Sequence, residues 1–329
     1  MELLKNYDLQ MHEFELIKRY FSKLSLNHKG SFNLNDDVFF DKSKKLVVTI
    51  DTYIEGIHFI NFKNPDLVIK KILRSSISDL ICKGVKPKYY FISGSGDKKS
   101  FTKKNLKLIS KSLNQEQKKY SIYLCGGDTT FSKKLSFSIT SVGFSNKIVF
   151  RNKAKLNDDI YVTGNLGDSF AGLKILQKKI YLNKSLTKYF KKKYYHPDLY
   201  LNITKKLLSI ANTSIDISDG LVTDLEKLIN NQKLSYKLFL QKIPTSKNLD
   251  KLISLKIFKK ISSVSCGDDY QILFTASPSK SRIISKISKS LGIKISKIGK
   301  ICKYSEKSQI IDEKNKKIAL KYKGYFHKF

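Results

Sequence analysis

The chain has 329 residues, of which 41% are hydrophobic and 12% aromatic, and its formal net charge is +35. This composition excludes an intrinsically disordered chain and is sufficient for about two domains with buried cores. No apolar run approaches the roughly 18 residues of a membrane-spanning helix. The first residues, Met1–Leu9, contain acidic side chains and no apolar signal region, so we expect a soluble, cytoplasmic protein.

The positive charge comes almost entirely from lysine. Of the 63 lysine and arginine residues, only four are arginines: Arg19, Arg74, Arg151 and Arg282. Base readout and bidentate phosphate contacts favour arginine, and the lysines are spread along the whole chain. We therefore expect lysine-rich solvated faces and no specific nucleic-acid binding.

The four cysteines are Cys82, Cys125, Cys266 and Cys302. They are far apart and have no histidine partners at the spacing of a metal site. We expect free thiols, buried or partly buried, in a reducing cytosol.

In the first half of the chain, the hydrophobic patterns predict alternating helices and strands. Apolar residues at helical spacing predict an amphipathic helix over Met11–Leu24. A long helix opens at Pro65-Asp66 and ends near Lys83-Gly84. Thr102 can cap a third helix that runs through Leu113. The predicted strands are Leu46–Ile50, Tyr89–Ser93, Ile122–Cys125 and Ser136–Val142.

The hydrophobic pattern lapses over Ser145–Asn157, and we place a boundary there between domains 1–148 and 149–329. The second half opens with a strand, Asp159–Thr163, a glycine-containing turn and a helix through Leu176. Mixed helices and strands in both halves predict two α/β or α+β domains. The further predicted helices are Leu199–Ala211, Asp219–Ile229 and Ser279–Leu291, and the further strands are Tyr236–Leu240, Gln271–Thr275 and Ile295–Ile301.

Aspartates follow several of the apolar runs, which is unexpected in so basic a protein. Like charges that are brought together repel unless a cation lies between them. Oxygen ligands suit Mg²⁺, whereas zinc would need the scarce histidines and cysteines. These aspartates therefore suggest a multi-metal phosphate site. They are Asp36-Asp37, Asp51, Asp79, Asp128, Asp216, Asp219 and Asp268-Asp269.

Each motif also has a simpler interpretation. Ser218 can be an ordinary helix N-cap followed by an acidic first turn. Asp128 can belong to a turn, and His58 can be a core histidine. Gly164–Ser169 can cradle a phosphate at a helix N-terminus, although many strand-to-helix turns use two glycines.

In their order along the chain, the motifs resemble the thiamine-monophosphate kinase family, within the aminoimidazole-ribotide-synthetase-like superfamily. The helix Ser78–Gly84 resembles the family's Asn-Leu-Ser-Asp-Leu-Ala-Ala-Met-Gly. The other matching segments are Asn35-Asp36-Asp37, Thr49–Thr52, Glu55–Phe59, Gly126–Thr130, Ile160–Leu173, Asp216–Leu221, Gly267–Thr275 and Lys323-Gly324-Tyr325.

The resemblance implies a two-domain fold in which the N-terminal α/β domain forms a dimeric β-barrel and the C-terminal domain is α+β. The implied reaction is direct in-line transfer of the ATP γ-phosphoryl group to thiamine monophosphate, without a phosphoenzyme. The implied partners are ATP, thiamine monophosphate, several Mg²⁺ ions and a second copy of the chain. Catalysis by positioning and charge neutralisation fits such a reaction.

Site residues carry over from the family by position, with no covalent catalyst. Asp51, Asp128 and Asp219 would carry the chemistry as metal ligands. The metal positions are Asp37, Thr49, Ile50, Asp51, Asp79, Asp128, Asp216 and Asp219. The ATP positions are Gly127, Asp128, Arg151 and Ser218, and the substrate positions are His58, Asp268 and Tyr325.

Four positions depart from the family's pattern. Asn35 replaces a glycine, Ile50 a threonine and Ser76 an asparagine, while Asp268 replaces a substrate-facing glutamate that is one methylene longer. Two alternatives remain open. One is another ATP-dependent enzyme of the superfamily with a different acceptor. The other is a basic binding protein, against which the intact acidic motifs argue.

Overall fold

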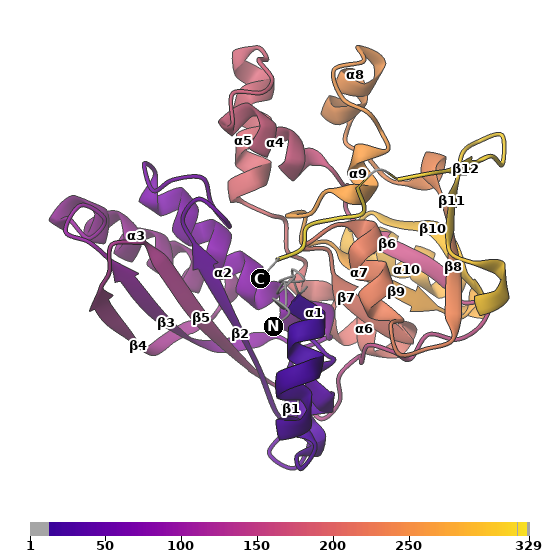
Figure 1. The fold of residues 1–329 in the computed structure, drawn as a ribbon, viewed down its shortest axis with the longest axis horizontal. Helices are drawn as coiled ribbons and strands as arrows, with labels where there is room; N and C mark the ends of the chain where they lie inside the picture. Colours follow the sequence, from indigo (N-terminus) through magenta and orange to yellow (C-terminus); the bar gives the residue numbers. More distant parts are fainter. Residues whose placement is uncertain (1–12, 321, 328–329) are drawn as a thin grey trace, which may run out of the picture.

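The structure is a computed structural model that describes residues 13–320 and 322–327. It contains two β-sheets, one in each half of the chain, and the long helix α2 (Pro65–Cys82) contacts strands of both (Figure 1). Pro65 occupies the first turn of α2, where its missing N–H costs no hydrogen bond. None of the helices in these residues is long and apolar enough to cross a bilayer.

The N-terminal half forms a five-stranded sheet in the order β1-β2-β5-β3-β4, with only β3 and β4 parallel. Helices α2 and α3 (Lys103–Tyr120) cover one face. The other face leaves large apolar side chains exposed, among them Ile50, Phe91 and Phe144. The strands are β1 (Phe39–Asp41), β2 (Leu46–Ile54), β3 (Pro87–Gly96), β4 (Tyr123–Phe131) and β5 (Ser136–Phe144).

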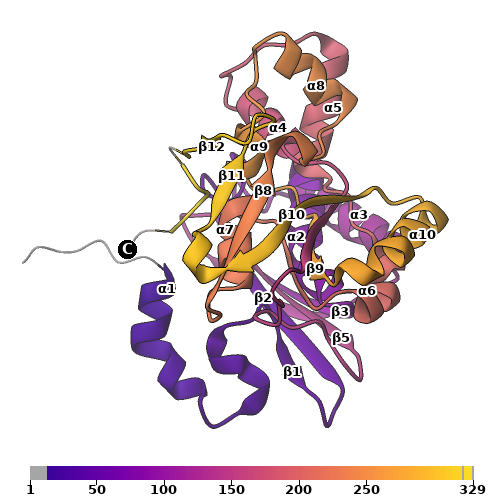
Figure 2. The same ribbon diagram turned by 90° about the vertical axis from the view of Figure 1, so that its right-hand side faces the viewer.

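The C-terminal half forms a seven-stranded sheet in the order β12-β11-β8-β10-β6-β9-β7. Helix α7 (Leu221–Leu228) packs on one face, and α6 (Thr204–Ile210) and α10 (Ser281–Leu291) pack on the other (Figure 2). The strands are β6 (Asp159–Thr163), β7 (Thr213–Asp216), β8 (Leu234–Phe239), β9 (Ile272–Ala276), β10 (Ile295–Lys303), β11 (Gln309–Ile311) and β12 (Lys317–Ile318).

Further helices lie outside the two sheets. The described part of the chain begins with α1 (Glu13–Leu16), which is followed by a π-helical turn and 3₁₀ turns as far as Leu34. In the second half, α4 and α5 pack together beyond the sheet. These two helices are α4 (Asp168–Leu176) and α5 (Lys184–Tyr195). Two short helices lie later in the chain, α8 (Lys247–Ser254) and α9 (Ser262–Ser265).

One apolar core crosses from the first half of the chain to the second. It includes Ile72 of α2, Leu207 of α6 and Phe274 of β9, all fully buried. Strand β6 is buried on both faces, because Tyr161 faces this core while Ile160 and Val162 face a second core under α7. The two halves are therefore packed together through side chains that exclude water, and α2 is held firmly between them.

Most predicted elements are confirmed, but three predictions near the acidic motifs are wrong. Strand β2 does not end before Asp51; it continues to Ile54. The strand predicted over Ile122–Cys125, β4, continues through Gly126–Asp128, so the alternative of a turn at Asp128 is also wrong. The helix predicted over Asp219–Ile229, α7, begins only at Leu221, so the alternative in which Ser218 caps it is also wrong. In each case, pairing with a neighbouring strand or a buried loop contact overrides the local sequence signal.

Other differences concern the termini and the cysteines. The predicted helix Met11–Leu24 begins outside the described residues; its described part is helical, but Phe21 and Leu24 are exposed. Helices α5, α8 and α9 and strands β1, β11 and β12 were not predicted. All four cysteines are free as predicted, although Cys125 is exposed.

Candidate active site

A cavity of about 700 Å³ lies between the two halves of the chain. Its volume is within the range of small-ligand sites. Gly127 and Asp128 are the two predicted site residues that do not line it, because they lie on the exposed edge strand β4. The predicted residues that line it are Asp37, Thr49, Ile50, Asp51, His58, Asp79, Arg151, Asp216, Ser218, Asp219, Asp268 and Tyr325.

Strand β2 and helix α2 present a first group of carboxylates to the cavity. Thr49 and Asp51 alternate with exposed residues along β2, so both side chains face α2. The Thr49 hydroxyl donates to Asp79 Oδ2 of α2 at 2.7 Å. Ser78, the residue before Asp79, donates to the buried Asp216 at the end of β7. Helix α2 thus brings aspartates from both sheets together.

These carboxylates share an unfavourable electrostatic environment. Burial raises the pKa of Asp51 to about 6 and that of Asp216 to about 8, and the negative charge of Asp37 adds to both shifts. Burial and the charges of Asp51 and Asp216 raise the pKa of Asp79 well above its usual value. Among the residues that the structure describes, Asp51 Oδ2 has no hydrogen-bond partner, and no lysine or arginine forms an ion pair with Asp51, Asp79 or Asp216. These three carboxylates therefore lack compensating positive charge.

The donor set suits magnesium. Mg²⁺ binds oxygen ligands and is commonly held by one or two carboxylates together with substrate phosphates and water. Within residues 13–320 and 322–327, no three carboxylate, histidine or cysteine side chains are arranged to hold an ion by themselves. The unpartnered Asp51 Oδ2 and the mutual repulsion of the aspartates fit ions that a nucleotide would help to bind.

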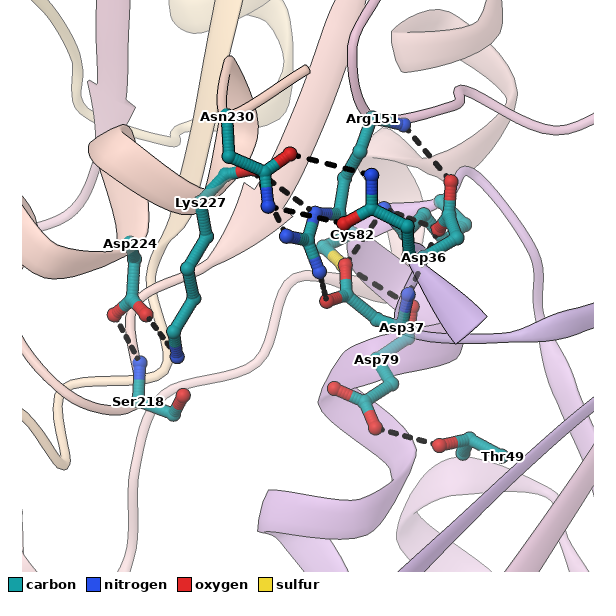
Figure 3. A network of polar contacts seen from close by, with 12 residues as sticks. Asp36, Asp37, Thr49, Asp79, Cys82, Arg151, Ser218, Asp224, Lys227 and Asn230 are labelled. Atoms are coloured by element: carbon teal, nitrogen blue, oxygen red, sulfur yellow. Dashed lines mark hydrogen bonds and ion pairs between the residues drawn. The ribbon is translucent and has the colours of Figure 1, made fainter. Parts of the chain in front are cut away.

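Asp37 differs from the other carboxylates because it already has cationic partners. Burial alone would raise its pKa, but Lys83 and Arg151 lower it below the usual value. The Arg151 side chain reaches from Asp37 Oδ1, at 3.2 Å, to the backbone carbonyl of Lys227, at 2.8 Å (Figure 3). Arg151 therefore lies at the junction of the halves, as its position in the sequence suggested.

Asp224, which the sequence analysis missed, organises the acidic loop before α7. Its Oδ2 accepts hydrogen bonds from the backbone N–H groups of Ser218, Asp219 and Gly220 at 2.9–3.0 Å. Lys227 pairs with both Asp219 and Asp224. No local sequence pattern indicates this role, because Asp224 lies inside a helix and accepts its hydrogen bonds from the loop that precedes the helix.

His58 lies at the other side of the cavity, in the turn after β2. The backbone N–H of Ile54 donates to His58 Nδ1 at 2.9 Å, which leaves Nε2 to carry the proton of the neutral ring. Burial, with a contribution from His327, lowers the pKa of His58 to about 4. At neutral pH, His58 is therefore an uncharged hydrogen-bond donor.

Asp268 is held by two residues that the sequence analysis did not identify. Its Oδ1 accepts from Lys71 at 2.7 Å and from the Tyr270 hydroxyl at 3.0 Å. Lys71 is almost completely buried, and its ammonium group lies 4.2 Å from the centre of the Tyr194 ring. With Oδ1 fixed in this way, Oδ2 is the atom that Asp268 can offer to a ligand.

The C-terminal segment closes this side of the cavity. The backbone N–H of Tyr325 donates to the Asp219 carbonyl at 3.0 Å. Gly324 allows this close approach, since a Cβ there would lie 2.0 Å from Thr223 Oγ1. The Tyr325 ring contacts His327, and the His327 ring contacts His58.

Comparisons with known proteins match both the sequence and the fold. Residues 35–145 match the family model for the N-terminal domain of AIR-synthase-related proteins. The thiamine-monophosphate kinase of Buchnera aphidicola subsp. Schizaphis graminum is 34% identical, with 97% of this chain and 99% of the relative covered. The chain belongs to the thiamine-monophosphate kinase family.

Two further comparisons support membership of this kinase family. The thiamine-monophosphate kinase of Haemophilus influenzae is 31% identical over 89% of this chain and 90% of that relative. A solved structure of AaThiL, complexed with AMPPCP and TMP, aligns with a TM-score of 0.83 and 26% identity over 99% of both chains. The chain is therefore a kinase of this family with the family's fold over its whole length.

The carboxylate cluster predicts a pH-dependent effect of metal on stability. The pKa values of Asp51, about 6, and Asp216, about 8, are higher in the folded protein than in the unfolded chain. Without metal, the folded state therefore becomes more stable as pH falls from 8 to 6.5 and these groups take up protons. Mg²⁺ needs the ionised forms, so it should raise the melting temperature more at pH 8 than at pH 6.5.

Thermal unfolding with EDTA or MgCl₂ at both pH values measures this effect. The window stops at pH 6.5 because His58, with its folded-state pKa of about 4, destabilises the folded protein below that pH. Asp216→Asn is the matched control and should lose part of the pH dependence. An equal effect of Mg²⁺ at both pH values would contradict the assignment.

Proposed function

We propose that this protein transfers the γ-phosphoryl group of ATP to the phosphate of thiamine monophosphate in the cytoplasm, giving thiamine diphosphate and ADP. The observation that supports this proposal is one cavity with two chemically different sides. One side carries the aspartates and Arg151, which suit a metal–triphosphate group. The other side carries His58, Asp268 and aromatic rings, which suit a cationic heterocycle.

At the substrate side, the free oxygen of Asp268 can accept a hydrogen bond from an aminopyrimidine or lie near the thiazolium charge. Lys71 and Tyr270 keep that carboxylate in one orientation. His58 can donate from Nε2, and Tyr325 can pack on a flat ring. Asp268 is one methylene shorter than the family's glutamate, and the Lys71 contact compensates by fixing where the shorter side chain points.

At the phosphate side, the main obstacle is the repulsion between two anionic groups. Bound Mg²⁺ would supply charge neutralisation and alignment for direct in-line transfer, without a phosphoenzyme. Ser218 and Arg151 are proposed to contact ATP, together with Gly127 and Asp128. The residues proposed to hold the ions are Thr49, Ile50, Asp51, Asp79, Asp128, Asp216 and Asp219. Asp37, the remaining metal position that the resemblance implies, is already paired with Lys83 and Arg151.

The test of this function is ADP release from Mg-ATP with thiamine monophosphate, with free thiamine or with no acceptor. We expect release only with thiamine monophosphate, and thiamine diphosphate as the product. Asp51→Asn should reduce turnover at least a hundredfold while the protein stays folded, because the buried charge that neutralising ions require is lost. Release with none of the acceptors, in a protein that still binds Mg-ATP, would refute the proposed acceptor and leave another enzyme of the superfamily as the alternative.

We further propose that the active unit is a homodimer in which the N-terminal units, residues 1–148, pair through their sheets and close a β-barrel. Strand β4 is exposed along its whole length, and the outer face of the sheet carries exposed Ile50, Phe91 and Phe144. An apolar face of this kind favours a partner. Because Asp128 does not line the cavity of its own chain, the proposal is that it completes the site of the partner chain.

Mixing two inactive variants tests this arrangement. Asp51→Asn and Asp128→Asn should each be inactive alone. If each site combines Asp51 of one chain with Asp128 of the other, a mixed dimer contains one intact site, and an equal mixture regains about a quarter of wild-type activity. If both residues act in one chain, every site in the mixed dimer carries a substitution. No recovery after subunit exchange, verified by mass spectrometry, would contradict a shared site.

A further inference from the structure

Lys83 is a completely buried lysine next to the aspartates of the phosphate side. It follows the last residue of α2 and has no exposed surface. Its ammonium group lies 2.8 Å from Asp36 Oδ1, 2.6 Å from Asp37 Oδ2 and 2.8 Å from the carbonyl of Ser214. Lysine is almost never fully buried without such partners. Its ammonium group therefore forms two ion pairs and one hydrogen bond.

The Asp36–Asp37 pair differs in charge balance from the rest of the cluster. Asp36 uses its oxygens for Lys83 and for the backbone N–H groups of Asp37 and Arg151. Asp37 binds Lys83 through Oδ2 and Arg151 through Oδ1. Two carboxylates thus face two fixed cations, and the pair is neutral.

The remaining carboxylates of the cluster have no such compensation. In the part of the chain that the structure describes, no lysine or arginine forms an ion pair with Asp51, Asp79 or Asp216. Divalent ions would therefore be drawn to these three residues and repelled by the ammonium group at Asp36–Asp37.

The residue at position 83 decides the charge balance of the Asp36–Asp37 pair, because Lys83 pairs with both carboxylates. Methionine is an unbranched side chain of similar length that carries no charge. A methionine at this position would leave Asp36 and Asp37 with Arg151 as their single fixed cation, and hence with a net negative charge.

We propose that the Lys83 ammonium is a built-in cation of the phosphate-transfer site, which replaces one divalent ion at Asp36–Asp37. The inference rests on the proposed function, since it concerns the same metal–nucleotide site. Asp37, which the sequence predicts as a metal ligand, then acts through its ion pairs with Lys83 and Arg151. The chain should bind one divalent ion fewer than a variant with methionine at position 83.

The test is the number of Mn²⁺ ions bound per chain in the presence of a non-hydrolysable ATP analogue, measured by electron paramagnetic resonance of free Mn²⁺. Lys83→Met should bind about one more ion than the wild type. Lys83→Arg, which keeps the charge, should bind the wild-type number. Lys86→Met removes an exposed lysine three residues away and is the control for a change in net charge. The same number for Lys83→Met and the wild type would overturn the inference.

A folding defect in Lys83→Met would not prevent the test. Loss of the ammonium leaves two buried carboxylates poorly neutralised, so the variant should depend on metal for stability. Mn²⁺ should then raise its melting temperature by more than it raises that of the wild type, and equal rises would overturn the inference. ADP release tests the proposed acceptor separately. If thiamine monophosphate is not the acceptor, the difference in bound Mn²⁺ between Lys83→Met and the wild type will remain. If the two proteins bind the same number of Mn²⁺ ions, the kinase activity will remain.

Discussion

Repulsion among buried aspartates is the constraint on which the site depends. Asp51 comes from one sheet, Asp216 from the other, and Asp79 from the helix between them. Their pKa values are raised because the fold withdraws them from water and places them together. A protein can tolerate this arrangement only when the packing around it is strong, and the apolar core shared by both halves provides that packing. Divalent cations bound beside these aspartates, as proposed, would relieve this repulsion.

The lysines of this protein fall into two groups with different physical roles. Most are solvated and follow the composition of the whole sequence. Lys71, Lys83 and Lys227 are buried or nearly buried and each pairs with an aspartate at the cavity. Lys71 orients Asp268, Lys83 pairs with Asp36 and Asp37, and Lys227 pairs with Asp219. In so lysine-rich a chain, the sequence does not distinguish these three from the solvated majority.

Sequence patterns correctly predicted the elements that are determined by residues close together in the sequence. The long helix from Pro65 and strand Asp159–Thr163 have strong apolar periodicity and clear boundaries, and both are confirmed. The errors occur where contacts distant in sequence decide the structure. Pairing with β5 extends β2 past Asp51, and pairing with β3 extends β4 through Asp128. Asp224 was missed because its role depends on a loop that folds back over it. The family motifs indicated the candidate site residues, but not that Asp128 lies away from the cavity of its own chain.

The central claim is that Asp51, Asp79 and Asp216 hold the divalent ions while Lys83 occupies the place of one. Anomalous diffraction from crystals grown with Mn²⁺, a non-hydrolysable ATP analogue and thiamine monophosphate tests it most directly. The account predicts Mn²⁺ peaks within about 2.3 Å of oxygens of Asp51 and Asp216, and no peak bound to Asp36 or Asp37. A peak bound to both Asp36 and Asp37, or nucleotide bound without any metal at Asp51 and Asp216, would contradict it.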